Sequence, residues 1–358
     1  MVSYDGWERE YLFNANDYNS IFADVMSKQG GDSVSGLQTE LAAIVGRKHA
    51  VVCNSATDAL TLSLVANNIG AGDEVLVTNF SFIASATSIS LSGARPVFCD
   101  IDLDSYHISL ASIKKMISPN TKALMYTHLF GNMVDITDVQ QFCTESGILL
   151  IEDAAQSLGS SLNSIRAGSI GKCSAISFNS NKVIAGISGG GALVTDDDDL
   201  AARVKSMTNH GLSDSTFDML GRNSRMYQLN AEVIRYRLRR INQWQLRRQQ
   251  IAMMYDSKLA SVPAIVQNVS SGLNHNYHKY VIRLGTKFTR DFIRRALNAS
   301  VHYDRPMSLH PMFDTIDHRT DLCVSSLIAA DTVLSLPIHA WMTDSEVNQV
   351  ATTIKSML

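Results

Sequence analysis

The sequence has few of the features that mark secreted, membrane or disordered proteins. Its 358 residues include only 6 prolines and no long low-complexity stretch, which argues against a fibrous or disordered chain. No run of about 18 uncharged apolar residues occurs, and the first ten residues carry four charged side chains where a signal peptide needs an apolar segment. We therefore expect a cytoplasmic protein with no membrane partner.

The sequence also has few cysteines and a small net charge. The 5 cysteines are odd in number, widely spaced and without a Cys-x-x-Cys pair, which favours buried free thiols over a metal site. The acidic run Asp196–Asp199 is typical of a solvated turn and a helix start, so we predict no metal. A net charge of −3 lacks the basic excess of nucleic-acid-binding proteins. Small molecules remain as the expected ligands.

What is present is an α/β pattern. At this length one core is not enough, so we expect a large domain over residues 1–224 and a smaller α+β domain over residues 225–358. In the first part short apolar runs alternate with helical stretches, which predicts a mostly parallel seven-stranded sheet between helices. The seven candidate strands are Ala50–Cys53, Glu74–Val77, Arg95–Cys99, Ala123–Thr127, Ile148–Ile151, Ala175–Phe178 and Ala192–Thr195.

A long helical stretch is expected beyond Arg225, as far as Leu259. It contains six arginines between positions 235 and 248, among apolar residues at helical spacing. We expect this basic face to lie in solvent or against a second subunit. A strand over His278–Leu284 and a terminal helix over Thr343–Met357 complete the predicted smaller domain.

The apolar run from Ile148 ends in two acids, Glu152 and Asp153, and Gln156 follows shortly after. The carboxyl ends of strands in α/β proteins are where ligands bind, so a carboxylate there is a candidate site residue. The alternative is that Asp153 only caps a following helix.

One βα unit later, the segment from Ser177 through Asn179 to Lys182 places a hydroxyl and an amine in the same region. A lysine in a crevice loses hydration, deprotonates more easily and can then form a Schiff base with an aldehyde. An isolated lysine is most often a surface residue. The glycine-rich run Gly186–Gly191 leads into a strand rather than a helix, so it is no dinucleotide fingerprint, and we expect it to pass close to the lysine.

A third segment, Cys53-Asn-Ser-Ala-Thr-Asp58, stands between a strand and an apolar-periodic helix. Free amides and hydroxyls at a helix start suit a phosphate, although Ser55 or Thr57 could be an ordinary cap. Together the three segments supply a phosphate cradle, a carboxylate for a ring nitrogen and a lysine for an aldehyde. This is the set that pyridoxal 5'-phosphate requires.

These segments resemble the sugar aminotransferases of the DegT/DnrJ/EryC1/StrS family, which have the fold of type I pyridoxal phosphate enzymes. The similarity extends to Phe82 in Asn-Phe-Ser-Phe, to Gly-Arg-Asn223-Ser-Arg-Met, to His278-Lys-Tyr280 and to Leu-Pro-Ile-His339. The resemblance implies a transaminase that moves an amino group between glutamate, which becomes 2-oxoglutarate, and a keto-sugar. It also implies a homodimer with shared active sites.

The resemblance implies specific roles for ten residues. Lys182 would bind the cofactor and Asp153 would pair with its ring nitrogen. Gln156 would lie near its phenolic oxygen and Phe82 would stack on its ring. The remaining cofactor-binding residues would be Ser55, Ala56, Thr57, Ser177, Asn179 and, from the neighbouring subunit, Asn223.

Departures from the family pattern bear on the substrate. Asn179-Ser180 stands where many relatives have His-Pro, and Gly189 replaces an acid. These features resemble enzymes that aminate C4 of UDP-linked 2-acetamido-4-keto-6-deoxy sugars for surface polysaccharides. The loop after Lys182 is one residue longer, as in C3 aminotransferases, and Ser308 replaces a common histidine. A C3 keto-sugar or cyclitol aminotransferase and a non-catalytic binding or regulatory protein stay open. A dehydratase of this fold would carry histidine at position 182.

Overall fold

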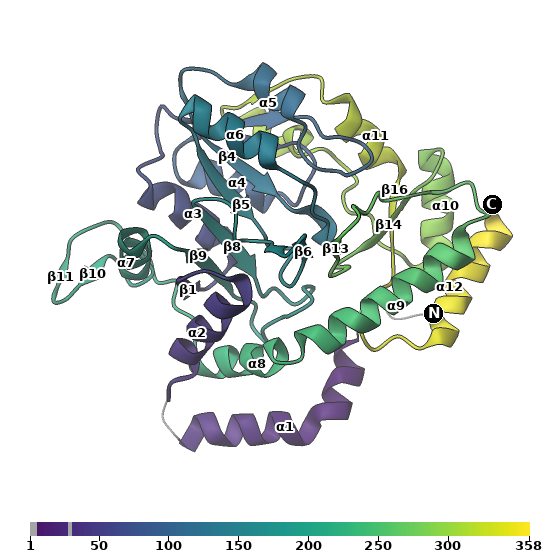
Figure 1. The fold of residues 1–358 in the computed structure, drawn as a ribbon, viewed down its shortest axis with the longest axis horizontal. Helices are drawn as coiled ribbons and strands as arrows, with labels where there is room; N and C mark the ends of the chain where they lie inside the picture. Colours follow the sequence, from purple (N-terminus) through teal and green to yellow (C-terminus); the bar gives the residue numbers. More distant parts are fainter. Residues whose placement is uncertain (1–5, 28–30) are drawn as a thin grey trace.

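The computed structural model describes residues 6–27 and 31–358, and its centre is a large twisted sheet (Figure 1). Within this part of the chain the sheet has eight strands, in the order β1-β9-β8-β5-β4-β2-β3-β15. From β8 through β15 every neighbouring pair is parallel, whereas β9 runs antiparallel to both β1 and β8. The predicted mostly parallel sheet between helices is therefore confirmed.

The strand predictions agree with the observed bounds to within a few residues, but the sheet has one strand more than predicted. The extra strand, β15, is only Arg319–Thr320 and pairs with β3 at the sheet edge. Two polar residues carry no apolar pattern, so nothing in the sequence marks them as a strand. The other seven strands are β1 His49–Cys53, β2 Glu74–Thr78, β3 Arg95–Cys99, β4 Thr121–Thr127, β5 Leu149–Asp153, β8 Cys173–Ser177 and β9 Gly191–Thr195.

Helices cover both faces of the sheet because alternate strand residues point in opposite directions. Val51 and Cys53 of β1 pack into the same cluster as α3 and α7, whereas Ala50 and Val52 pack against α2 and α8. One face is covered by α3 (Ala56–Ala66), α4 (Ala84–Leu91) and α7 (Asp198–Met207), and the other by α2 (Ser33–Val45), α5 (Leu110–Met116), α6 (Thr137–Ser146) and α8 (Gln228–Leu238).

The C-terminal part forms its own cluster around a three-stranded sheet in the order β12-β14-β16 (Figure 1). The division of the chain at residues 224 and 225 remains a prediction. The helical stretch predicted beyond Arg225 is two helices, α8 and α9, interrupted at Arg239 and Arg240. The elements of this cluster are α9 Ile241–Leu259, β12 Ile265–Val266, β14 Tyr280–Arg283, α10 Lys287–Leu297, β16 Val333–Leu336 and α12 Asp344–Met357.

Shorter elements connect these units. The first helix, α1 (Trp7–Ser27), bends at Asn14 and lies along α8. A small hairpin of β10 (Leu212–Ser213) and β11 (Thr216–Phe217) projects from the body beside α7 (Figure 1). The rest are β6 Ser161–Leu162, β7 Ile165–Arg166 and β13 Leu273–Asn274 in one small sheet, three 3-10 turns at Leu129–Gly131, Met307–Leu309 and Pro311–Asp314, and α11 Val324–Thr332.

The expectation that the arginines of 235–248 face solvent or a subunit is wrong for two of them. Arg237 and Arg248 are only 5% and 8% exposed. Arg237 donates to both carboxylate oxygens of Glu10 in α1, and Arg248 donates to two backbone carbonyls. A guanidinium tolerates burial when its donors are satisfied in this way.

The predicted buried free thiols and the predicted helix start at the acidic run are both confirmed. All five cysteines are free and buried. Asp197 caps α7, because its side chain accepts a hydrogen bond from the amide of Leu200. No cluster of potential metal ligands occurs among residues 6–27 and 31–358, and no helix in those ranges is long and apolar enough to cross a membrane.

Candidate functional site

Lys182 lies in a tight turn that follows β8. Its amide donates to the carbonyl of Asn179 over 2.9 Å. The chain then folds back, so that the amide of Gly186 donates to the carbonyl of Phe178. Burial of the amine lowers the pKa of Lys182 to about 8, against the opposing effect of the nearby Asp153 carboxylate. An amine with this pKa is partly neutral near pH 8 and therefore available as a nucleophile.

Asp153 is the last residue of β5, in the centre of the sheet, and is 5% exposed. One carboxylate oxygen accepts from the hydroxyl of Ser85 over 2.6 Å, and the other accepts from the amide of Ala155 over 3.1 Å. Both hydrogen bonds fix the direction of the carboxylate. The side chain does not cap a helix, since residues 154–160 form turns, so the capping alternative is excluded.

The start of α3 forms a polar cradle together with the ends of β8 and β9. Gly191 pairs with Ser177 across the two strands, and an added Cβ at Gly191 would lie only 2.2 Å from the carbonyl carbon of Ser55. This close approach requires glycine, and it brings Ser177 beside Ser55 and Ala56 at the amino end of α3. The same end of the helix, with its free amides and dipole, suits an anion such as a phosphate.

Ser55 is also the cap of α3, because its hydroxyl accepts from the amide of Asp58. The alternative that it is an ordinary cap is therefore correct as far as the helix is concerned. Thr57 lies in the first helical turn and is half-buried. The glycine run 186–191 approaches the α3 start at Gly191 and Asn230 at Gly186 and Gly190, and its approach to Lys182 stays a prediction.

Gln156 and Phe82 meet Tyr303 from the C-terminal part of the chain. The amide nitrogen of Gln156 donates to the Tyr303 hydroxyl over 3.1 Å, and its oxygen accepts from the amide of Phe130. The ring of Phe82 lies 6.3 Å from that of Tyr303 and is 55% exposed. Phe82 thus presents an open aromatic face.

Asn179 and Asn223 lie apart from the buried residues of the site. Both are exposed. The neighbours of Asn223 are tied to the start of α3, because Arg222 and Ser224 both donate to the Asp58 carboxylate. Among the described residues, no hydrogen bond joins the Asn223 side chain to the cradle of its own chain.

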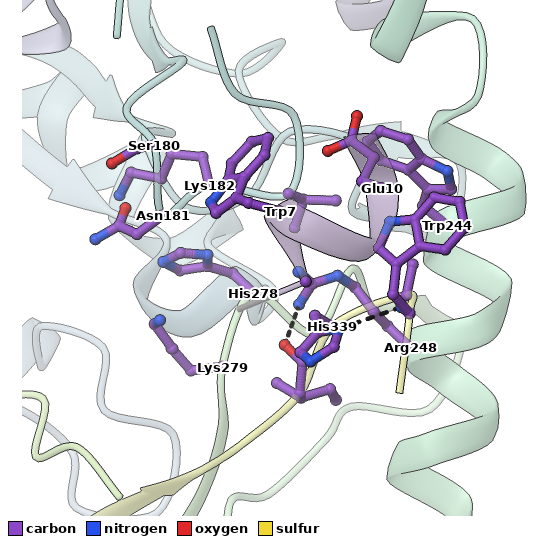
Figure 2. Close-up of a pocket in the computed structure, with 15 residues that line it drawn as sticks. Trp7, Glu10, Ser180, Asn181, Lys182, Trp244, Arg248, His278, Lys279 and His339 are labelled. Atoms are coloured by element: carbon purple, nitrogen blue, oxygen red, sulfur yellow. Dashed lines mark hydrogen bonds between the residues drawn. The ribbon is translucent and has the colours of Figure 1, made fainter. Parts of the chain in front are cut away.

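A cavity of about 220 Å³ opens beside Lys182 (Figure 2). Of the predicted site residues, Lys182 alone is among those that line it within the described chain. Five segments far apart in sequence contribute walls. They are Gly6, Trp7 and Glu10 near the start of α1, Ser180–Val183 in the lysine turn, Trp244 and Arg248 of α9, the pair His278 and Lys279, and the four residues Ile338–Trp341.

The cavity wall is basic. Besides Lys182 it includes Lys279 and Arg248, which are 6% and 8% exposed. Burial, and then the charges of Lys182 and Arg248, lower the pKa of Lys279 to about 7. Burial also holds the pKa of His278 well below its ordinary value, so this imidazole is neutral at pH 7.

The residues present fit pyridoxal phosphate. Gly191 keeps the cradle at the start of α3 open, an oriented carboxylate lies at the end of β5, and a lysine with a lowered pKa stands next to a cavity. These groups would hold a phosphate, a protonated ring nitrogen and an aldehyde respectively.

The sequence missed Ser85, Tyr303 and Lys279 as candidates. Ser85 is 68 residues from Asp153, and Tyr303 is 147 residues from Gln156, so only the fold brings them together. Lys279 was within reach of sequence reasoning, because it stands inside the His278-Lys-Tyr280 stretch that resembles the family.

Comparison with known proteins agrees with this geometry. Residues 15–355 match the model of the DegT/DnrJ/EryC1/StrS aminotransferase family. The chain is 32% identical to GDP-perosamine synthase of Caulobacter vibrioides, over 99% of this chain and 96% of that protein. It is 33% identical to a UDP-N-acetyl-3-dehydro-alpha-D-glucosamine 3-aminotransferase of Acidithiobacillus ferrooxidans, over 92% and 89%.

The fold is shared with solved structures. The X-ray structure of S. venezuelae DesV in complex with a ketimine intermediate superposes with a TM-score of 0.92 at 29% identity, over 98% of this chain and 96% of DesV. An aminotransferase from Brucella abortus that carries the four family names in its description also gives a TM-score of 0.92, at 25% identity and 99% coverage of both chains.

Proposed function

The chain belongs to the DegT/DnrJ/EryC1/StrS aminotransferase family, and on that premise we propose that it transfers an amino group from glutamate to a nucleotide-linked keto-sugar. Enzymes of this family depend on pyridoxal phosphate. The observation that supports the proposal most is the position of Lys182. The Lys182 amine has a lowered pKa and interacts electrostatically with the Asp153 carboxylate. The lysine also lines a cavity large enough for a small substrate.

Each residue of the site has a task in this reaction. Asp153, held by Ser85 and by an amide, would keep the cofactor's ring nitrogen protonated. The bound cofactor would supply a ring that withdraws electrons from the donor's α-carbon. The Lys182 amine would take the proton from that carbon and return a proton to the acceptor side. Ser55, Ala56, Thr57 and Ser177 would hold the phosphate, while Gln156 and Phe82 would orient the ring.

We propose a UDP-linked 2-acetamido-4-keto-6-deoxy sugar as the acceptor, in the synthesis of a surface polysaccharide. The sequence features around Asn179 and Gly189 support this choice. The two relatives compared above differ in their printed names, one a perosamine synthase and one a 3-aminotransferase, so C3 keto-sugars and cyclitols belong in the same test.

The decisive experiment offers the purified protein glutamate and a panel of 3-keto and 4-keto sugars linked to UDP, GDP and dTDP. We expect 2-oxoglutarate and one amino sugar to form in equal amounts, as detected by mass spectrometry. Lys182→Ala should abolish both products, whereas Lys287→Ala, at an exposed lysine on α10, should leave them unchanged. A protein that binds no pyridoxal phosphate and aminates no member of the panel would favour the non-catalytic alternative.

We also propose a cytoplasmic homodimer in which Asn223 completes the site of the partner subunit. The exposure of Asn223 beside the α3 start supports this arrangement. Lys182→Ala and Asn223→Ala should each be inactive alone. Refolded together as a mixture, they should regain about a quarter of the wild-type activity, because half of the dimers then hold one intact site. If Asn223 serves its own subunit, no activity returns.

A further inference from the structure

One wall of the cavity beside the lysine turn comes from the start of the described chain. Gly6, Trp7 and Glu10 line the cavity together with the lysine turn and residues of α9. Figure 2 shows the Trp7 side chain between the lysine turn and α9. The match to the family model begins only at residue 15, so it does not cover this part of α1. The role of the segment must therefore be read from its own contacts.

Charged contacts hold this segment on two sides. The Arg9 guanidinium donates to both carboxylate oxygens of Glu346 in α12, over 2.7 and 2.8 Å. The Glu10 carboxylate accepts from two nitrogens of Arg237 in α8, over 2.8 and 3.1 Å. Paired hydrogen bonds of this kind fix direction as well as distance. The segment is thus tied to α8 by one pair and to α12 by the other.

The segment also packs closely against the cavity wall formed by residues 338–341. An added Cβ at Gly6 would lie 2.6 Å from Nδ1 of His339 and 2.9 Å from the Trp341 ring, so a larger residue would displace these side chains. Further along the helix, the Phe13 ring lies 5.4 Å from a ring of the same Trp341, measured between ring centres. Trp7 stands between these two contacts, and its side chain lines the cavity.

The space left beside this wall is small. The cavity has a volume of about 220 Å³. This is below the roughly 300–1,000 Å³ that is usual for small-molecule sites. It is enough for an amino acid or a single sugar ring, but not for a whole nucleotide-linked sugar. An indole is among the bulkiest side chains, so Trp7 takes up space into which a larger ligand would otherwise extend.

We propose that Trp7 is a specificity-determining residue, held by the strap of residues 6–13 where its indole limits the size of molecules that reach the Lys182 amine. The molecules admitted are amino acids and single sugar rings, while a nucleotide attached to the sugar stays outside this wall. This inference rests on the proposed function, in which Lys182 is the reacting amine, and it adds selection by size to that function.

Acylation of Lys182 in the full-length protein, freed of bound cofactor, tests the proposal without any transfer reaction. The probes are the N-hydroxysuccinimide esters of acetic acid and of the much bulkier pyrenebutyric acid. Burial lowers the pKa of Lys182 to about 8, so the reaction is run near that pH. Mass spectrometry of the peptide that carries Lys182 measures the label. The label on the exposed Lys287 in the same sample corrects for the different reactivities of the two esters.

After this correction, we expect the wild type to favour the acetyl ester at Lys182 by at least about 10-fold, a ratio that a pocket of fixed size can produce. Trp7→Ala should remove most of this preference, because the pyrene then fits. Arg9→Ala, which releases the strap from α12, should change it in the same direction by a smaller factor. The matched control is Phe22→Ala, at an exposed ring in the second half of the same helix, which should keep the wild-type preference.

Each outcome decides the matter. Equal labelling of Lys182 by the two esters in the wild type, or no labelling by either, overturns the proposal. An unchanged preference in Trp7→Ala, or an equal loss in Phe22→Ala, also overturns it. If Trp7→Ala fails to fold, as judged by circular dichroism, Trp7→Phe replaces it, with a smaller loss of preference expected. No amino donor or keto-sugar takes part, so a failure of the proposed transfer does not affect this result.

Discussion

At the scale of single residues, the chemistry depends on how Asp153 is held. Its two oxygens accept from Ser85 and from the amide of Ala155, which fixes the direction of the carboxylate. Ser85 therefore acts through Asp153 and is a positioning residue.

We expect Asp153→Asn to lower kcat by about 10²- to 10⁴-fold, because an amide cannot stabilise the proton on the ring nitrogen. Ser85→Ala should lower kcat by about 10-fold, the effect of one hydrogen bond to a charged group. The measurement is steady-state kinetics alongside the cofactor dissociation constant. Asp153→Asn should still bind the cofactor, and a variant that keeps normal turnover would remove Asp153 from its assigned role.

Some residues of the candidate site could be predicted from the sequence and others could not. Asp153 and Lys182 were accessible from the sequence, because each follows an apolar strand at the edge where ligands bind in α/β sheets. Ser85, Tyr303 and Arg237 were not, because each acquires its environment from a segment more than 60 residues away. No local pattern records such contacts.

At the scale of elements, the junction between β9 and α3 shapes the phosphate cradle. A Cβ at Gly191 would lie 2.2 Å from the Ser55 carbonyl carbon and 2.4 Å from the Ala56 nitrogen. These are backbone atoms, which cannot rotate aside as a side chain can.

Gly191→Ala should therefore destabilise the protein by about 1–3 kcal/mol, the usual cost of overpacking, and weaken pyridoxal phosphate binding by at least about 10-fold. Thermal unfolding and a cofactor titration measure the two effects. The matched control is Gly285→Ala, where an added Cβ meets no atom within 4 Å. Equal behaviour of the two variants would contradict this account of the cradle.

Arg237 ties α1 to the loop that follows Lys182. It binds Glu10 of α1, donates to the carbonyl of Ala185 over 2.6 Å, and lies 4.1 Å from the ring centre of Trp7. Because Trp7 and Glu10 line the cavity, the same arginine supports a wall of the binding site.

We expect Arg237→Leu to cost about 3–5 kcal/mol of unfolding free energy, because Glu10 is left buried without its partner. Arg240→Leu, which breaks a more exposed pair between the turn after α8 and Asp17 of α1, should cost no more than about 1 kcal/mol. Urea unfolding compares them. Similar losses of unfolding free energy in both variants would mean that the buried pair stabilises the protein no more than the exposed pair does.

At the scale of the whole molecule, several histidines are buried in the neutral state. Burial lowers the pKa of His107, His275 and His302 to about 3. In the unfolded chain each titrates near 6.5, so between pH 3 and 6.5 the unfolded state binds more protons than the folded state. Stability is therefore lost as the pH falls through this window and is fully present above it.

We predict that the free energy of unfolding falls between pH 6.5 and 4.5 by about 1 kcal/mol per pH unit for each such histidine. This range lies above the titration of most carboxylates. Urea unfolding at several pH values measures the slope, and His107→Gln should reduce it. Replacement of the half-buried His49 by Gln provides the comparison. A slope that His107→Gln leaves unchanged would refute the assignment.

The overall architecture was largely predictable, because alternating apolar strands and helices define a parallel sheet wherever they occur. Strand β3 was predicted with its observed bounds, Arg95–Cys99. Strand β15 was not, since two polar residues become a strand only by contact with β3. The break between α8 and α9 at Arg239 and Arg240 was not predicted either, because no proline or glycine marks it in the sequence.

That edge strand has a consequence for synthesis on the ribosome. Strand β3 ends at Cys99, but its outer neighbour begins at Arg319, roughly 220 residues later. At about 5–20 residues per second, the edge of β3 waits on the order of 10–40 s for its partner. An uncovered strand edge is a template for pairing with other chains. Nascent chains truncated before residue 319 should therefore recruit chaperones more strongly than the complete protein.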